Sequence, residues 1–291
     1  MSSQLIAVTG ATGELGGRVA ARLAEAGAAP RLIVRDPARA PRLPGAEVTQ
    51  FAGYRDGESM RRALEGADTL FLVSATEDPD RVGLHATAVD AAAAAGVRRI
   101  VYTSFAGAAP DATFTYARDH FHAEEHIRSS GLDHTFLRHN LYIEFIPHMC
   151  PPDGVIRGPA GEGRAAIVSR EDLADVAAVV LTGHGHEGAT YEVTGAEALT
   201  LADAAAELSR VTRRQITFEH QTVEEARASR QDGETPDWMI EGWVSSYAAI
   251  EAGDLEKVTD TVEELTGHQP RRLLDWLREH PESYRHLLAT A

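Results

Sequence analysis

Cysteine and positive charge are both scarce in this chain of 291 residues. The single cysteine, Cys150, excludes an internal disulfide and is typical of a reducing compartment. The formal net charge of −16 argues against nucleic acid as a partner, because a protein that neutralises phosphates needs a basic face. Both scarcities favour an intracellular protein that does not bind nucleic acid.

Long apolar runs are also missing. No run reaches the roughly 18 to 20 residues of a membrane span. The opening MSSQLIAVTG lacks the charged and then apolar segments of a signal peptide. We therefore expect a soluble, cytoplasmic protein without a membrane partner. The hydrophobic content of 43% suffices for one large α/β domain, or for one domain with a smaller lobe.

Glycine is present where a nucleotide-binding turn needs it. The segment IAVTGATGELGGRVAARLAEAG (6–27) leads from an apolar strand pattern through Gly10, Gly13 and Gly16 into a helical apolar stripe. In such a turn the first glycine bends the chain, the second admits the phosphates and the third lets the helix pack close to its strand. Because strand and helix flank the glycines, the segment predicts a dinucleotide site.

The first half of the chain alternates strand patterns with helical ones. We expect strands at 5–8, 31–35, 46–51, 68–74, 98–104 and 134–140, with helices around 56–66, 81–96 and 119–131. This alternation predicts an α/β fold with a doubly wound parallel sheet, whose ligands lie at the carboxyl ends of the strands. We expect a Rossmann domain over 1–150 and a smaller α/β lobe over 151–291. A helix around 171–182 is expected to pack back on the first domain.

The end of the second expected strand bears on the choice of cofactor. In RDPARA (35–40), Arg35 stands where NAD-selective enzymes carry an acid for the ribose, and Arg39 follows one turn later. Arginine suits the 2′-phosphate of NADP through charge-assisted hydrogen bonds. Asp36 keeps NAD open as an alternative, and a solvated surface pair is another. We expect NADP(H).

Several segments resemble the NmrA-like branch of the atypical short-chain dehydrogenases/reductases. They are TGATGELG (9–16), VRDPARA (34–40), AAAAAGVRRIVYTS (91–104), GLDHTFLRHNLYIE (131–144) and the stretch 169–209. Within that branch the chain is most similar to NADPH-dependent quinone oxidoreductases and triphenylmethane-dye reductases. The similarity fades from about Phe218, where substrate specificity is expected to be set.

The resemblance implies a set of cofactor-binding residues. They are Gly10, Thr12, Gly13, Leu15 and Gly16 at the pyrophosphate, Arg35 and Arg39 at the adenosine phosphate, Ser74 near the ribose and phosphates, and Thr103 with Ser104 beside the nicotinamide. Gly53 stands where the branch commonly has an acid near the adenine. Adenine recognition is therefore left to Tyr54, Asp56 or backbone groups.

The segment YTSFAGAAPDATFTYARDHFHAEEH (102–126) holds the candidate catalytic residues. Standard members of the superfamily use a serine to polarise a carbonyl, a tyrosine to donate the proton and a lysine to lower the tyrosine pKa. Ser104 and Tyr116 have suitable spacing, but His120 replaces the lysine, as it does in the NmrA-like branch. A mostly neutral histidine activates tyrosine poorly, yet a quinone needs little acid. Tyr116 is thus a proton donor, a stacking partner or a pocket wall.

Aromatic residues of the second half are candidates for substrate binding. In PDWMIEGWVSSYAAI (236–250), Trp238 and Trp243 follow a helical stripe that suits either a buried core or a flat aromatic substrate. We expect both of them, with Tyr142, to contact the substrate. The histidines of HFHAEEH (120–126) lack the order of a zinc-binding helix, and we expect no functional metal.

Two classes of function remain open. One is an NADPH-dependent oxidoreductase that transfers hydride to a quinone-like or other conjugated aromatic or carbonyl acceptor, with ketone or imine reduction through Tyr116 as a variant. The other is a non-catalytic NAD(P)-sensing regulator that binds a partner protein. Because no tail or linker marks a partner site, we favour the enzyme, as a monomer or homodimer.

Overall fold

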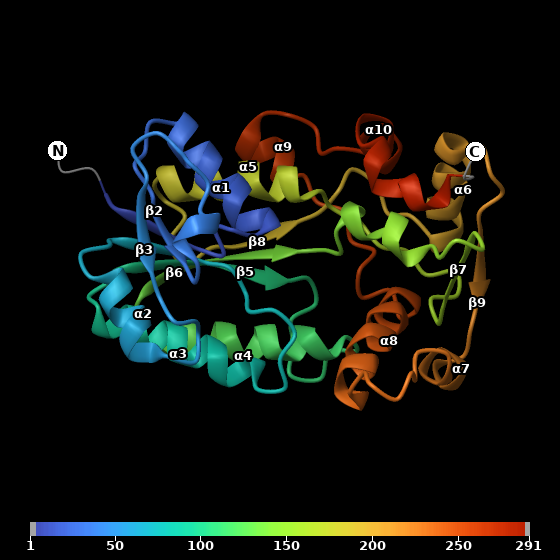
Figure 1. Ribbon diagram of the computed structural model, residues 1–291, viewed down its shortest axis with the longest axis horizontal. Helices are drawn as coiled ribbons and strands as arrows, with labels where there is room; N and C mark the ends of the chain where they lie inside the picture. The colour runs from blue at the N-terminus through green and yellow to red at the C-terminus, as the bar shows by residue number, and fades with distance from the viewer. Residues whose placement is uncertain (1–3, 289–291) are drawn as a thin grey trace. The chain divides into compact units, whose positions relative to one another are not determined.

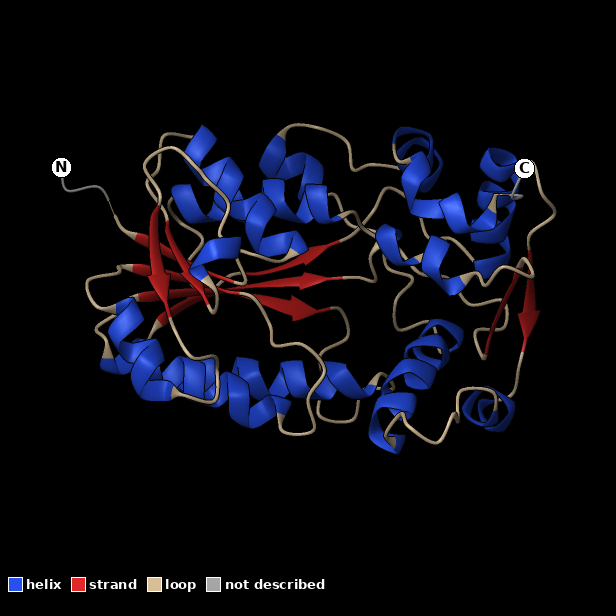
Figure 2. Ribbon diagram, in the orientation of Figure 1, coloured by secondary structure: helices blue, strands red, loops and turns tan. Residues whose placement is uncertain are grey.

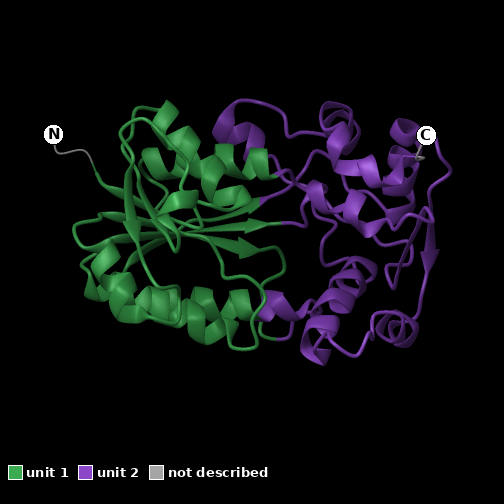
Figure 3. Cartoon of the chain, in the orientation of Figure 1, with its two compact units in different colours: residues 1–110, 119–139, 170–192 green, residues 111–118, 140–169, 193–291 purple. Residues whose placement is uncertain are grey.

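The computed structural model describes residues 4–288, and the chain divides into two compact units (Figure 3). Unit 1 comprises Met1–Pro110, Asp119–His139 and Arg170–Glu192, and unit 2 comprises Asp111–Arg118, Asn140–Ser169 and Val193–Ala291. Each unit is thus assembled from separate stretches of the chain. Among the described residues, no helix is both long and apolar enough to cross a bilayer.

Unit 1 is built on a seven-stranded sheet with the strand order β3-β2-β1-β4-β5-β6-β8. The strands are β1 (Ile6–Thr9), β2 (Arg31–Val34), β3 (Glu47–Gln50), β4 (Thr69–Leu72), β5 (Arg99–Phe105), β6 (Asp133–His139) and β8 (Thr190–Val193). Each neighbouring pair from β3 to β6 is parallel. The order reverses between β1 and β4, and such a reversal opens a crevice at the carboxyl ends of the strands.

Helices cover both faces of this sheet (Figure 1, Figure 2). On one face lie α1 (Glu14–Glu25) and α5 (Arg170–Thr182). On the other lie α2 (Gly57–Leu64), α3 (Arg81–Ala94) and α4 (Thr115–Ser129). Because both faces are covered, β1, β4 and β5 are buried along their whole length. The predicted α/β class with a doubly wound parallel sheet is confirmed.

The core of unit 1 forms where apolar stripes of the helices meet the sheet. Fully buried side chains include Phe71, Tyr102, Phe136, Leu23 and Ile127. Helices α1 and α5, which lie on the same face of the sheet, are joined by ion pairs of Arg18 with Glu171 and of Arg22 with Asp175. The segment expected to pack back on the first domain therefore lies in unit 1 as α5.

Within residues 4–288, unit 2 combines five complete helices with a two-stranded parallel sheet. The helices are α6 (Leu201–Thr212), α7 (Val223–Ala228), α8 (Asp237–Glu251), α9 (Thr261–Thr266) and α10 (Leu273–Glu279), and the strands are β7 (Val155–Gly158) and β9 (Thr217–His220). A capping box of Thr200 and Asp203 starts α6. Short 3-10 turns lie at Ile143–Phe145, Pro147–Met149 and Pro281–Leu287, and one in unit 1 at Pro37–Arg39.

Two boundaries differ from those expected from sequence. The chain leaves unit 1 after His139, where β6 ends, rather than at residue 150. Helix α4 begins at Thr115 rather than near 119, and its first turn belongs to unit 2. There the backbone N–H of Thr115 donates to the Ser245 hydroxyl at 3.2 Å. This contact spans 130 positions of the sequence, so no local pattern reveals it.

Candidate functional site

The turn between β1 and α1 is shaped by its glycines. Gly10 has a φ of +63°, a left-handed conformation that favours glycine. A Cβ atom at Gly16 would lie 2.4 Å from the carbonyl oxygen of Gly10, so only glycine lets α1 start so close to β1. The Gly13 N–H donates to the Gly10 carbonyl at 2.8 Å. The turn therefore brings the start of α1 to the carboxyl end of β1.

The other residues expected in this turn differ in exposure. Gly13 is exposed and stands immediately before α1, so a ligand can approach its backbone. Thr12 is half-buried, whereas the Leu15 side chain is only 7% exposed and belongs to the core. Leu15 can therefore serve a ligand through its backbone alone.

Two arginines follow β2 on the surface. Arg35 and Arg39 are exposed, and neither side chain has a hydrogen bond or ion pair with any other residue of 4–288. The Asp36 carboxylate accepts the N–H of Ala38 at 3.0 Å and so caps the 3-10 turn at Pro37–Arg39. Asp36, the acid because of which NAD is an alternative cofactor, thus caps this turn. The two guanidinium groups are available to an anion.

The residues considered for adenine recognition have polar atoms bound within the protein. The Tyr54 hydroxyl donates to the Val73 carbonyl at 2.7 Å, and burial raises the pKa of Tyr54 to about 12. The Asp56 carboxylate accepts the Ser59 N–H at 2.9 Å and caps α2. The Tyr54 ring, the second oxygen of the exposed Asp56 carboxylate and backbone groups remain to contact a base.

At the end of β4, Ser74 is half-buried and Thr103 of β5 holds its backbone. The Thr103 side chain is only 1% exposed. Its hydroxyl accepts the Ser74 N–H at 2.8 Å and donates to the Leu72 carbonyl at 3.4 Å. Thr103 therefore binds β4 rather than presenting its hydroxyl at the surface of unit 1.

Ser104 points into unit 1. Its side chain is fully buried and its hydroxyl donates to the Glu124 carboxylate at 2.6 Å. Arg138 binds both oxygens of the same carboxylate, at 2.8 Å and 2.6 Å. This pairing compensates the buried charge of Glu124. Ser104 thus completes a buried ionic cluster, and its hydroxyl is not available to polarise a substrate carbonyl.

His120 is also buried, and both of its ring nitrogens have protein partners. Nε2 lies 3.0 Å from an Arg81 guanidinium nitrogen and Nδ1 lies 2.8 Å from the Tyr102 hydroxyl. A guanidinium can only donate, so Nε2 accepts and the proton of the neutral ring is on Nδ1. Burial, together with the charge of Arg81, holds the pKa of His120 well below its usual value. His120 is therefore neutral and does not reproduce the charge of the lysine it replaces.

Tyr116 lies in unit 2 and packs against α8. A Cβ atom at Gly242 would lie 2.6 Å from both the hydroxyl oxygen and Cζ of Tyr116. The Phe114 ring contacts the Tyr116 ring edge-on, with centroids 5.4 Å apart. The glycine in the middle of α8 thus makes room for the tyrosine.

A pocket of about 430 Å³ lies in unit 2. It is lined by Arg227, Gln231, Asp237, Trp238, Ile240 and Glu241. Trp238 was expected at a substrate site and does line this pocket. Trp243 and Tyr142 are half-buried elsewhere in unit 2, and Tyr142 packs near Phe145 with ring centroids 5.8 Å apart. Arg227 and Glu241, which form an ion pair at 2.5 Å, were not anticipated because their spacing in sequence gives no signal.

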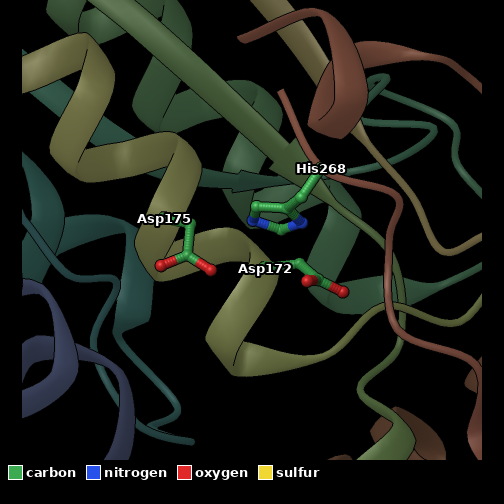
Figure 4. Close-up of side chains that lie close together, drawn as sticks. All are labelled: Asp172, Asp175 and His268. Carbon is green, nitrogen blue, oxygen red and sulfur yellow. The ribbon is translucent and has the colours of Figure 1, made fainter. Parts of the chain in front are cut away.

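Figure 4 draws two carboxylates and an imidazole that could hold a cation by residue type. Asp172 and Asp175 lie on α5 of unit 1, and Asp175 forms an ion pair with Arg22. His268 belongs to unit 2. Because the group draws on two different units and one carboxylate is already paired, we assign no metal site to it.

Comparison with known proteins gives consistent matches. A family model described as NAD(P)H-binding matches residues 10–184. The (4-alkanoyl-5-oxo-2,5-dihydrofuran-3-yl)methyl phosphate reductase of Streptomyces griseus is 40% identical, over 96% of this chain and 99% of the relative.

Two solved structures are similar over nearly their whole length. An NADPH-dependent quinone oxidoreductase from Escherichia coli, complexed with NADPH, has a TM-score of 0.86 and 34% identity, covering 94% of this chain and 99% of that one. A triphenylmethane reductase from Citrobacter sp., complexed with NADP(H), has a TM-score of 0.81 and 31% identity, covering 97% and 100%. The resemblance to quinone oxidoreductases and dye reductases is confirmed.

Proposed function

This chain belongs to the NAD(P)H-binding family, and from that premise we propose that it is an NADPH-dependent oxidoreductase that reduces conjugated, quinone-like acceptors. Unit 1 binds the cofactor and unit 2 supplies residues for the acceptor. The observation that carries the choice of acceptor is the burial of Ser104, the group that would polarise a carbonyl, and of His120, which stands in place of the lysine that would activate the tyrosine.

The residues present fit a phosphorylated dinucleotide. The Gly10–Gly16 turn has a cradle that a Cβ atom at Gly16 would fill, and such turns admit a pyrophosphate at a helix N-terminus. Arg35 and Arg39 suit the extra phosphate of NADPH, because both are exposed cations in a chain of net charge −16. Asp36 is the one carboxylate in RDPARA (35–40), and one of its oxygens is engaged in capping the 3-10 turn.

The acceptors named for the three similar proteins share a chemical property. A quinone, a triphenylmethane dye and an acylated dihydrofuranone are all conjugated, so the electron pair they accept is delocalised. Bound NADPH supplies that pair as a hydride. A delocalised product needs only a weak acid or water as its proton source. The protein therefore works without a hydroxyl activated by a neighbouring lysine.

In this scheme the candidate residues have separate tasks. The glycine turn and the two arginines bind the cofactor, and Ser74 contacts it from the end of β4. Tyr116 acts as a wall of the acceptor site, and Tyr142, Trp238 and Trp243 stay candidates for contact with the acceptor, although only Trp238 among these three lines the pocket of unit 2. Ser104 and His120 act on the structure of unit 1 and not on the acceptor, because their polar atoms are engaged in its interior.

The test measures cofactor binding and turnover separately. NADPH and NADH are titrated against the protein, and NADPH consumption is then followed with 1,4-benzoquinone and with cyclohexanone. We expect NADPH to bind more tightly than NADH, and to be consumed with the quinone but not with the ketone. Tight binding without consumption would favour a sensor, and efficient ketone reduction would favour a carbonyl reductase.

Replacing Tyr116 by phenylalanine tests its assignment as a wall. We expect Tyr116→Phe to lower turnover with benzoquinone by less than about tenfold, short of the roughly 10²- to 10⁴-fold that a positioned acid supplies. The ring and its contact with Phe114 are kept in this variant. A near-total loss of quinone turnover would instead identify Tyr116 as the proton donor.

A further inference from the structure

Side chains from four different segments of unit 1 bind the backbone of the three residues that follow β4, Val73–Ala75. The sheet ladder ends near Leu72, and beyond it the backbone N–H of Val73 donates to the Thr9 hydroxyl at 2.9 Å. The Ser74 N–H donates to the Thr103 hydroxyl at 2.8 Å. Each threonine hydroxyl also lies within hydrogen-bond distance of a carbonyl of β4. The two threonines thus extend the ladder on both sides of β4 by one hydrogen bond each.

Helix α3 holds the far end of this segment at Ala75. The Ala75 N–H donates to Nε2 of His85 at 2.9 Å, and Nε of Arg81 donates to the Ala75 carbonyl at 2.9 Å. Arg81 and His85 are four residues apart, so they share one face of the helix. The N–H and the carbonyl of Ala75 are therefore both bound, by two side chains from one turn of α3.

The two α3 side chains are themselves buried. Arg81 is 7% exposed and reaches Asp119 at 3.5 Å and His120 at 3.0 Å, while His85 is fully buried. Nδ1 of His85 has no hydrogen-bond partner among the described residues. Burying an imidazole with an unpartnered nitrogen costs free energy, so this side chain does more than fill space. The contact with Ala75 is what the histidine supplies and an apolar side chain would not.

The segment also lies against the glycine turn. A Cβ atom at Gly10 would lie 3.2 Å from Cβ of Val73, so the turn packs directly on the side chain of the first held residue. The Tyr54 hydroxyl binds the Val73 carbonyl from a further side. A displacement of Val73–Ala75 would therefore move both Ser74 and the wall against which Gly10 is packed.

We propose that Val73–Ala75 is a pre-organised wall of the cofactor site and that His85 and Arg81 are positioning residues that fix it. This inference rests on the proposed binding of NADPH to unit 1. Fixing the backbone before the ligand arrives removes an ordering cost from binding. His85 and Arg81 act through Ala75, so their loss weakens NADPH binding without removing a contact to the cofactor.

The test compares two variants at one position with a matched control. His85→Leu removes the acceptor for the Ala75 N–H, whereas His85→Gln keeps one, because Oε1 of glutamine lies as many bonds from Cα as Nε2 of histidine. Val89→Ala is the control, since Val89 is fully buried one turn further along α3 and carries no polar atom. Arg81 is less suitable because its guanidinium also contacts Asp119 and His120.

NADPH dissociation constants and urea unfolding curves are measured for all four proteins. We expect about a tenfold weaker NADPH affinity in His85→Leu, and an affinity within about threefold of the unmutated protein in His85→Gln. Val89→Ala should lose stability through its smaller side chain while its NADPH affinity changes less than about twofold. Equal weakening in His85→Leu and Val89→Ala, or no recovery with glutamine, would overturn the proposal.

A measurement on the unmutated protein covers the case in which His85→Leu does not fold. Without NADPH, the Ala75 amide should exchange its hydrogen slowly, unlike that of the exposed Thr76. Equally fast exchange at both would overturn the inference alone. Failure of the unmutated protein to bind NADPH would instead overturn the proposed function, and the inference with it.

Discussion

At the scale of single residues, the proposed choice of cofactor depends on the Arg35 side chain. The Arg35 side chain is exposed and unpaired within residues 4–288, so we expect Arg35→Ala to act on cofactor binding and not on the fold. We expect the preference for NADPH over NADH to fall about ten- to hundredfold, because a charge-assisted hydrogen bond contributes roughly 1.5 to 3 kcal/mol. Titration of both cofactors measures this ratio.

Arg42 provides the control for charge. It is exposed on the same loop, and Arg42→Ala changes the net charge by the same amount. If the two variants lose the preference equally, long-range attraction and not a contact at Arg35 selects the cofactor.

Two glycines of the turn should respond differently to the same substitution. A valine at Gly13 stands on an exposed backbone whose nearest neighbour is a carbonyl oxygen at 3.2 Å, so we expect a folded protein that binds NADPH poorly. At Gly16 the Cβ atom would meet backbone at 2.4 Å, and we expect Gly16→Val to destabilise the fold. Urea unfolding and NADPH titration of both variants separate these effects. Unchanged NADPH affinity in Gly13→Val would contradict a pyrophosphate at this turn.

At the scale of elements, α8 contains a glycine that helix propensity alone disfavours. Alanine in a helix interior is more favourable than glycine by about 1 kcal/mol, but at Gly242 its Cβ atom would overlap the Tyr116 ring. We therefore expect Gly242→Ala to lower the free energy of unfolding. In a Tyr116→Leu background, which lacks the overlapping atoms, the same change should be neutral or stabilising.

A double-mutant cycle measured by urea unfolding tests this coupling. Additive effects of the two substitutions would show that the ring moves aside without cost. The cycle also reports on the first turn of α4, because Tyr116 lies in that turn.

The strands and most helices were predictable because their signals are local. The run IAVTG (6–10) and the helix 81–96 depend on neighbouring residues, and the structure places β1 and α3 within those segments. The geometry of the turn before α1 was likewise predictable from three glycines, and its contact with the cofactor stays a prediction. The roles of Ser104 and His120 were not, because spacing along the chain does not show which face of β5 or α4 a side chain occupies. Their partners Glu124 and Arg81 lie 20 and 39 residues away.

At the scale of the whole molecule, buried histidines make stability depend on pH. Burial, and then the charge of Arg81, lowers the pKa of His85 to about 3. In the unfolded chain a histidine titrates near pH 6.5. Below that pH the unfolded state binds a proton that the folded state does not, so the free energy of unfolding falls as the solution is acidified. His120, whose pKa is also lowered, adds to this loss.

The contribution of His85 is measured by comparison with His85→Gln, which cannot take up the proton. Between about pH 7.5 and pH 5 the unmutated protein should lose about 2 kcal/mol more than the variant. Urea unfolding at the two pH values gives both differences. Equal losses in the two proteins would show that the folded state takes up a proton at His85 as readily as the unfolded state.

The two units alternate along the chain, and this order limits how one of them can be exchanged by recombination. Unit 2 is encoded in three separate stretches, so no single crossover between genes can replace it while leaving unit 1 intact. One crossover could transfer at most the last stretch, Val193–Ala291, and with it only part of unit 2.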